Sequence, residues 1–271
     1  MNLGTVAEIR RYPVKSMMGE TLPAADVVAG GIAGDRALAL LDAATGRVAT
    51  AKHPRLWRAL LQFSAATEPA GVVIALPDGI TVAAGDAEVD AVLSAAVGRD
   101  VRLTAERPEG VLIERAVPEE VLEQGVDAEV DFVTSVLARG TPGGTFVDFA
   151  PVHVVTTATL EAVGVEALRY RPNLVIETDG EPFTENDWAG REFEVGDVRL
   201  RGLVPTPRCA VPTLEHGELP RAPHAVRALL DTNRVDVLDM GPQPCAGVYA
   251  EVLTSGLIRL GDAVDMIDGD R

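Results

Sequence analysis

Apolar residues recur along this chain in short alternating or continuous runs, separated by turns rich in glycine, proline and aspartate. Alternation with a period of two residues predicts strands, and a spacing of three to four residues predicts helices. In the first half of the chain this pattern predicts strands at 5–12, 26–29, 37–42, 47–50, 72–76, 80–83 and 101–104. It predicts one helix from His53 through Leu61 and a second helix through Val97 that Asp86 would cap.

Strands dominate from Thr145 onward. They are expected at 152–156, 174–177, 191–195, 198–204, 247–253 and 263–267, with helices at 157–168 and 222–233. Many short strands with Gly-Asp turns are typical of closed or nearly closed barrels, whereas a doubly wound sheet would alternate strands with long helices. The acidic stretch 106–144, which is punctuated by proline and glycine, is expected to contain a linker or a mobile surface segment.

Composition and charge narrow the class of protein. With 271 residues, 47% of them apolar, the chain can build one large domain or two modest ones. Its formal net charge of -17 argues against binding to nucleic acid or to anionic membranes. No apolar run approaches the roughly 20 residues that span a bilayer, and the N-terminus lacks the apolar core of a signal peptide. A cytoplasmic location is therefore expected.

Several classes of motif are missing from the sequence. Two cysteines, Cys209 and Cys245, cannot form a disulfide framework or hold a cysteine-rich iron–sulfur cluster. Four scattered histidines argue against a zinc site, and no Gly-x-Gly-x-x-Gly, phosphate-binding loop or Gly-x-Ser-x-Gly motif occurs. Any redox reaction of this chain must therefore take its electrons from elsewhere.

Cys209 offers a thiolate beside the fixed charge of Arg208, which favours the charged sulfur that attacks electrophiles or binds metals. The alternative is a small buried hydrophobic residue, which is how we interpret Cys245 at the start of an apolar strand. Lys15 and Ser16 follow the end of a strand, where an ammonium and a hydroxyl could hold a phosphate or lie solvated on a turn.

Two arginines complete the candidates for an anion site. Arg36 follows a glycine-rich turn that permits close approach of the backbone, and it could bind the same anion or pair with a nearby acid. Pro172 would present Arg171 and Asn173 rigidly at the entrance of a strand, a pair that suits an oxygen-rich heterocycle or a phosphate. An ion pair of Arg171 with an acid of the preceding helix is the alternative. Trp188, on an acidic loop, is expected to plug the core rather than to support a site.

Seven runs of residues together resemble the MOSC family, named for the C-terminal domain of molybdenum-cofactor sulfurases, and the resemblance extends nearly end to end. The runs are Tyr12-Pro13-Val14-Lys15-Ser16, Gly34-Asp35-Arg36, Phe146-Val147-Asp148, Thr156-Thr157-Ala158-Thr159-Leu160, Arg171-Pro172-Asn173, Arg208-Cys209 and Gly256-Leu257-Ile258-Arg259-Leu260-Gly261-Asp262. The most similar group is that of the mitochondrial amidoxime-reducing components and their bacterial relatives. Residues 214–217 depart from the usual sequence after the cysteine, and the cluster cysteines of the ferredoxin-like domain found in longer relatives are missing.

The resemblance implies an α+β, β-rich fold. A MOSC-type β-barrel would be formed by residues 1–36 and 135–271, with a small α/β subdomain inserted at 37–134. The implied ligand is the molybdenum cofactor, with Cys209 as both metal ligand and catalytic residue. The implied cofactor-binding residues are Lys15, Ser16, Arg36, Thr156, Thr157, Thr159, Arg171, Asn173 and Arg208.

The reaction that the resemblance implies is two-electron oxygen-atom transfer at molybdenum, which reduces N-hydroxylated or other N-oxygenated small molecules. A separate flavin or iron–sulfur protein would donate the electrons, and pyridoxal phosphate is not expected. Two alternatives are a non-catalytic carrier or storage protein for the cofactor, and a sulfur carrier in which Cys209 bears a persulfide.

Overall fold

The computed structural model describes residues 1–138, 141 and 144–267. Its strands are β1 (Asn2–Arg11), β2 (Glu20–Leu22), β3 (Ala24–Val28), β4 (Gly31–Ile32), β5 (Ala39–Asp42), β6 (Ser64–Glu68), β7 (Gly71–Ala75), β8 (Thr81–Ala83), β9 (Val101–Thr104), β10 (Leu112–Ala116), β11 (Phe132–Val136), β12 (Val152–Thr156), β13 (Leu174–Glu177), β14 (Glu192–Val195), β15 (Val198–Pro207), β16 (Arg234–Asp236), β17 (Pro242–Thr254), β18 (Gly256–Arg259) and β19 (Ala263–Met266). Its α-helices are α1 (Pro54–Trp57), α2 (Val89–Val97), α3 (Pro118–Gln124), α4 (Thr157–Val163), α5 (Ala167–Tyr170) and α6 (His224–Thr232). Short 3-10 helices lie at Arg58–Gln62, Thr184–Trp188, Val211–Thr213 and Leu238–Met240.

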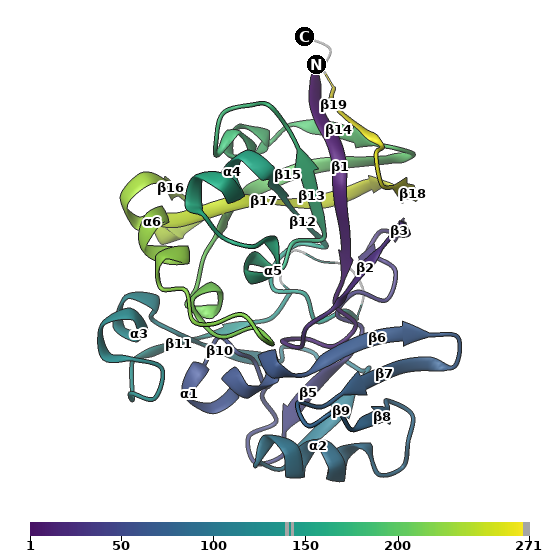
Figure 1. The fold of residues 1–271 in the computed structure, drawn as a ribbon, viewed down its shortest axis with the longest axis vertical. Helices are drawn as coiled ribbons and strands as arrows, with labels where there is room; N and C mark the ends of the chain where they lie inside the picture. The colour runs from purple at the N-terminus through teal and green to yellow at the C-terminus, as the bar shows by residue number, and fades with distance from the viewer. Residues whose placement is uncertain (139–140, 142–143, 268–271) are drawn as a thin grey trace.

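Seven strands close into a barrel within the described ranges, which confirms the predicted β-rich fold. The strand order is β12, β13, β1, β19, β14, β15 and β17, and β17 pairs back with β12 to complete the circle. All of these pairings are antiparallel except β12 with β13. The barrel forms the upper part of the molecule in Figure 1, where the first strand β1 and the last strand β19 run side by side.

The interior of the barrel is filled by the apolar side chains that alternate along its strands, among them Val6, Ile9, Leu200 and Val264. Trp188 is almost completely buried in this core and packs against Phe193 at a ring-centroid distance of 5.4 Å. The expectation that Trp188 plugs the core is therefore confirmed.

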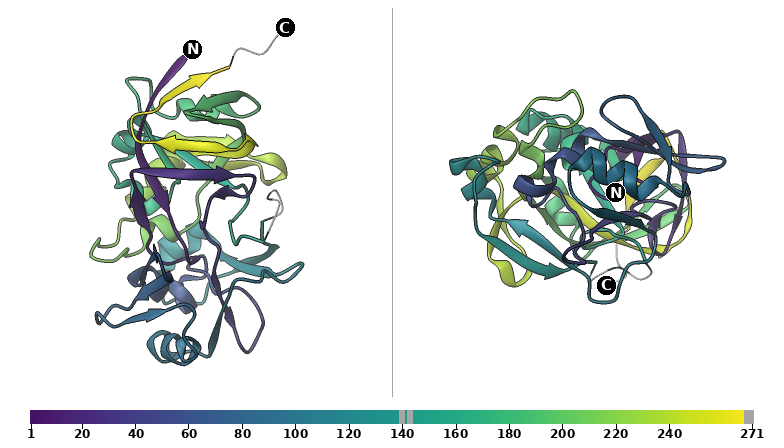
Figure 2. Two further views of the ribbon diagram at one scale, coloured as in Figure 1. Left: turned by 90° about the vertical axis from the view of Figure 1, so that its right-hand side faces the viewer. Right: turned by 90° about the horizontal axis from the view of Figure 1, so that it is seen from below.

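A second group of elements forms the lower part of the molecule (Figures 1 and 2). It consists of the two-stranded sheet β5–β9, the three-stranded sheet β6–β7–β8 and the helices α1 and α2. It has a separate core that includes Leu40, Phe63, Ile74 and Leu93. Val14, which precedes residue 36, also packs in this core. The proposed division at residues 36 and 135 stays a prediction.

Several expected elements differ from those observed. The stretch 106–144, expected to contain a linker or a mobile surface segment, also holds β10, α3 and β11; its residues 139–140 and 142–143 lie outside the described part. Gly164, with φ +72°, ends α4, so the helix expected at 157–168 is divided into α4 and α5. Residues 47–50 form no strand, since Val48 makes only an isolated bridge to Leu41.

Asp86 does not cap α2. Glu88 precedes that helix, while the Asp86 carboxylate accepts a hydrogen bond from the backbone N–H of Ala83 at 3.1 Å. Among the described residues, no helix is long and apolar enough to cross a membrane.

Candidate functional site

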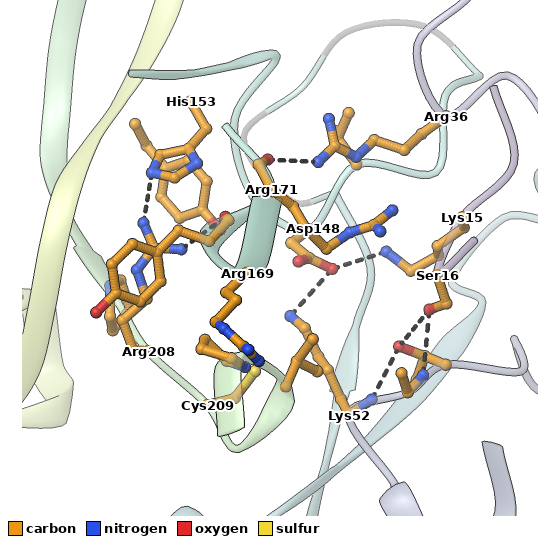
Figure 3. A pocket seen from close by; sticks show the side chains of 18 of the residues that line it. Lys15, Ser16, Arg36, Lys52, Asp148, His153, Arg169, Arg171, Arg208 and Cys209 are labelled. Atoms are coloured by element: carbon orange, nitrogen blue, oxygen red, sulfur yellow. Dashed lines mark hydrogen bonds and ion pairs between the residues drawn. The ribbon is translucent and has the colours of Figure 1, made fainter. Parts of the chain in front are cut away.

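A cavity that is partly open to solvent lies where the barrel meets the second group of elements. Its lining comes from the loops that follow β1, β4 and β15, from the segment before α1, from the segment before β12 and from the end of α5 (Figure 3). Of the predicted site residues, the structure brings together Lys15, Ser16, Arg36, Arg171, Asn173, Arg208 and Cys209. Lys52, Asp148, His153 and Arg169 also line the cavity.

Three lining residues have a backbone conformation that side chains other than glycine rarely adopt. The φ angles of Ser16, Arg36 and Arg171 are +65°, +45° and +53°. Each such residue costs about 1–2 kcal/mol of strain, and strain of this kind is often retained where a side chain must point in one direction. Arg171 ends α5 and is followed by Pro172, so the left-handed turn directs its side chain into the cavity (Figure 3).

Two lysines share one carboxylate in this cavity. The Lys15 ammonium donates to Asp148 Oδ1 at 2.7 Å and to the Phe146 carbonyl at 2.8 Å, and the Lys52 ammonium lies 3.0 Å from the same Oδ1 (Figure 3). Burial lowers the pKa of Lys15 to about 8. Burial acts to raise the pKa of Asp148, but the two ammonium groups hold that pKa well below its usual 3.8. Asp148 is therefore ionised at neutral pH.

Arg36 and Arg171 have different partners. The Arg36 guanidinium pairs with Asp35 and donates to the Arg171 carbonyl at 3.1 Å and to Asn173 Oδ1 at 3.4 Å. Both terminal nitrogens of Arg171 are buried without a hydrogen-bond partner in the described part of the chain. Burial, reinforced by the charge of Arg36, lowers the pKa of Arg171 to about 10. A buried cation without a counterion is costly, so this guanidinium calls for an anionic ligand.

Arg208 is held by neutral acceptors. Its Nε donates to the Ala246 carbonyl at 3.0 Å, its Nη1 donates to the Tyr170 carbonyl at 3.0 Å, and its Nη2 donates to Ala246 O and to His153 Nε2. Burial and the charge of Arg208 hold the pKa of His153 well below its usual 6.5. The imidazole is therefore neutral, with its proton on Nδ1 and its Nε2 free to accept.

The two cysteines lie in different surroundings. Cys209 is half-buried and lines the cavity, whereas Cys245 is fully buried in β17 and is not part of the lining. Burial raises the pKa of Cys245 to about 11, which leaves it an inert thiol at neutral pH. Of the chain's two sulfur nucleophiles, only Cys209 can meet a ligand held by the cavity cations.

The threonines that the resemblance implied as cofactor contacts lie elsewhere, because none of them lines the cavity. Thr156 caps α4 by accepting from the Thr159 N–H at 3.2 Å, and both hydroxyls donate to the buried carboxylate of Glu185 at 3.0 and 2.9 Å. The Thr157 hydroxyl accepts from the backbone N–H of Thr178 at 3.2 Å. In the structure these three hydroxyls stabilise the junction of β12 and α4.

Sequence reasoning missed Lys52 and Asp148 as site residues. A usable signal was present, because only two of the 24 basic residues are lysines and both lie in this cavity. Where arginine replaces lysine almost everywhere, a retained lysine marks a position that needs a compact ammonium. Asp148 belonged to a run that carried the family resemblance, yet no role had been inferred for it.

The arrangement favours an anion that meets the thiol of Cys209. Counting only described residues, six basic side chains line the cavity: Lys15, Arg36, Lys52, Arg169, Arg171 and Arg208. They face one lining acid, Asp148, while Asp35 and Glu166 pair with two of them from outside the lining. The remaining positive charge, in a chain of net charge -17, fits a phosphate or another oxyanion.

Comparison with family models matched two segments of the chain. Residues 3–114 match the MOSC N-terminal beta barrel domain, and residues 144–265 match the MOSC domain. Comparison with curated proteins gave no significant match.

Among solved structures, the YUAD protein from Bacillus subtilis aligns over 97% of this chain and 94% of its own, at 10% identity and a TM-score of 0.44. YiiM from Geobacillus stearothermophilus aligns over 44% of this chain at 19% identity and a TM-score of 0.32. The aligned part spans 55% of the YiiM chain.

Proposed function

Because the chain belongs to the MOSC-domain family, which is associated with molybdenum-cofactor binding, we propose that its cavity binds this cofactor and that the protein reduces small N-oxygenated compounds. The observation that carries the proposal is the guanidinium of Arg171, whose terminal nitrogens are buried without a partner among the described residues, in the same cavity as the thiol of Cys209. The guanidinium needs an anion and the thiol is a soft metal ligand. A metal cofactor that carries a phosphate supplies an anion for the first and a metal for the second.

The residues present fit the cofactor. Lys15, Lys52 and Arg36 surround one side of the cavity and would hold its phosphate, with the Ser16 hydroxyl nearby. Arg171 and Asn173 would contact the pterin, with the unpartnered Arg171 guanidinium also available to the cofactor's phosphate, and Cys209 would bind the metal. When bound, the cofactor would supply two-electron redox chemistry at molybdenum.

The chain's own residues supply orientation and protons. Arg208, fixed by His153 and two carbonyls, keeps the backbone that leads into Cys209 in place. Reduction of an N-hydroxylated compound breaks the N–O bond, consumes two electrons and two protons, and releases water. The Lys15 ammonium, whose pKa is about 8, remains mostly protonated at neutral pH and pairs with an Asp148 carboxylate that is partly exposed. The pair offers one route by which solvent protons reach the cavity.

Within the family we propose the subgroup that resembles the amidoxime-reducing components. The sequence has no dinucleotide-binding motif and no cluster cysteines, which supports a separate flavin or iron–sulfur protein as electron donor.

The test is metal and pterin analysis of protein made in a host that synthesises the cofactor, together with reduction of an aromatic amidoxime by a reduced viologen. We expect about one molybdenum per chain and turnover of the amidoxime. Cys209→Ser should abolish reduction, whereas the matched variant Cys245→Ser should keep both metal and activity, because Cys245 is not in the cavity. Bound cofactor without any turnover would indicate a carrier, and a requirement for Cys245 instead of Cys209 would refute the ligand assignment.

A further inference from the structure

Arg36 and Arg171 lie over the ring of one buried residue, Tyr12, which does not itself line the cavity. The guanidinium carbons are 4.6 Å and 4.3 Å from the ring centroid, respectively. These distances are within the range of cation–π attraction. Tyr12 is completely buried, and its hydroxyl has no hydrogen-bond partner among the residues that the structure describes.

The charges around the ring do not balance. The carboxylate within this group is that of Asp35, which pairs with Arg36 and accepts the Tyr12 backbone N–H at 2.8 Å. Arg171 has no acid and no hydrogen-bond acceptor for its terminal nitrogens in the described ranges. A carboxylate at this place would neutralise the cation that the ligand needs. The face of an aromatic ring attracts a cation through its quadrupole and leaves the net charge in place.

The ring is also fixed in position. A Cβ atom at Gly19 would lie 2.7 Å from Tyr12 Cδ1, so the Gly19 backbone packs directly against the edge of the ring. The Tyr12 carbonyl accepts the Arg36 backbone N–H at 2.7 Å, which ties the ring and one of its cations to the same turn.

We propose that Tyr12 is a positioning residue whose ring holds Arg36 and Arg171 by cation–π attraction, so that both guanidiniums face a phosphate-bearing ligand while only Arg36 has a carboxylate partner among the described residues. The choice of ligand rests on the proposed function, while the holding of the cations by the ring does not. The hydroxyl, which has no partner among the described residues, has no part in this role.

The test distinguishes cation–π attraction by the Tyr12 ring from simple packing of the ring. Tyr12→Phe should retain pterin and phosphate as well as the wild type does. Incorporation of mono-, di- and trifluorophenylalanine at position 12 keeps nearly the same volume and progressively weakens the cation–π attraction. Bound pterin is measured after gel filtration, and calorimetry gives the Kd of inorganic phosphate for cofactor-free protein. We expect the phosphate Kd to rise stepwise with fluorination, by about tenfold at the trifluoro variant.

Trifluorophenylalanine at Phe193 is the matched control, because that ring is equally buried and packs against Trp188 in the barrel core. It should leave the phosphate Kd unchanged. If all fluorinated variants at position 12 bind phosphate as the Phe variant does, the ring acts only by packing and the proposal is wrong. If wild-type protein contains no molybdenum but the fluorination series still weakens phosphate binding, the proposed function fails and this inference stands.

Discussion

Replacement of Arg171 by methionine is expected to move two measurements in opposite directions. In cofactor-free protein the variant should be more stable than the wild type, because a buried guanidinium that has no ion-pair partner among the described residues is removed. In protein made with cofactor, the same variant should lose pterin, because that guanidinium is the one cavity cation whose terminal nitrogens are buried and unpartnered in the described structure. Methionine keeps an unbranched apolar side chain over the Tyr12 ring.

The magnitude follows from the pKa of Arg171, which burial and Arg36 hold at about 10 against the ordinary 12.5. The folded state binds this proton less tightly than the unfolded state, so folding disfavours the charged form by roughly 3 kcal/mol at neutral pH. Loss of the contact with Tyr12 offsets about 2 kcal/mol of that gain. A net stabilisation of about 1 kcal/mol remains, or roughly 2–4 °C in melting temperature.

On the ligand side, one lost charge-assisted contact costs about 1.5–3 kcal/mol, which corresponds to roughly 10- to 150-fold weaker retention. The assay is thermal unfolding of cofactor-free protein together with pterin content after gel filtration.

Arg169→Met is the matched control for this experiment. Arg169 is only 2% exposed, more buried than Arg171, and its guanidinium is fully hydrogen-bonded: to Glu166 at 2.7 Å and to the carbonyls of Leu214 and Pro220 at 3.1 and 2.8 Å. Its removal leaves acceptors unpaired and should destabilise cofactor-free protein by about 2 kcal/mol. If Arg171→Met destabilises the cofactor-free protein to the same extent, Arg171 is a structural cation and the reasoning is refuted.

Three further predictions concern pH, backbone and electron supply. Burial lowers the pKa of His216 to about 4, so as the pH falls below about 6.5 the unfolded chain binds a proton that the folded chain does not. The free energy of unfolding should therefore fall by up to roughly 3 kcal/mol between pH 6.5 and 4. An equal pH dependence in the His216→Gln variant would contradict this. A Cβ at Gly247 (φ +81°) would lie 2.5 Å from both His153 Nε2 and Val154 O. Denaturant unfolding should therefore show that Gly247→Ala lowers the free energy of unfolding by about 3 kcal/mol. The control Gly190→Ala should lower it by about 1 kcal/mol, because Gly190 has a similar φ but open space around its Cβ position. The isolated chain should not oxidise NADH, and turnover with a docked donor should slow as salt rises, because the net charge of -17 favours a basic partner; NADH oxidation by the chain alone would disprove the first part.

The barrel could be predicted from the sequence because its strands bury one face and therefore alternate apolar and polar residues. The antiparallel pair β10–β11 could not, since Phe132 and Val133 are 46% and 60% exposed and β11 leaves no buried face to produce an alternation. The break between α4 and α5 had a local signal in Gly164, whose left-handed conformation ends the first helix.

The site was predictable as far as its residues lay in recognisable runs. Lys52 and His153 acquire their roles only through tertiary contacts, with Asp148 and Arg208 respectively, which no local pattern encodes. For the threonines, by contrast, a local pattern was present but fitted two different roles. A hydroxyl followed three residues later by another fits a helix cap as well as a ligand contact, and the structure shows Thr156 as the cap of α4.

Both lysines of the chain lie in one cavity with 5% and 6% of their surface exposed, which determines how the protein responds to amine-directed chemistry. The outer surface offers no lysine to an acylating or crosslinking reagent. Lys15, with a pKa of about 8, carries a substantial fraction of neutral, nucleophilic amine under mildly alkaline conditions. A small amine-reactive label should therefore modify Lys15 only when the cavity is open. Mass spectrometry of the labelled peptides would thus report cavity occupancy in the unaltered protein, without a mutation or a spectroscopic probe.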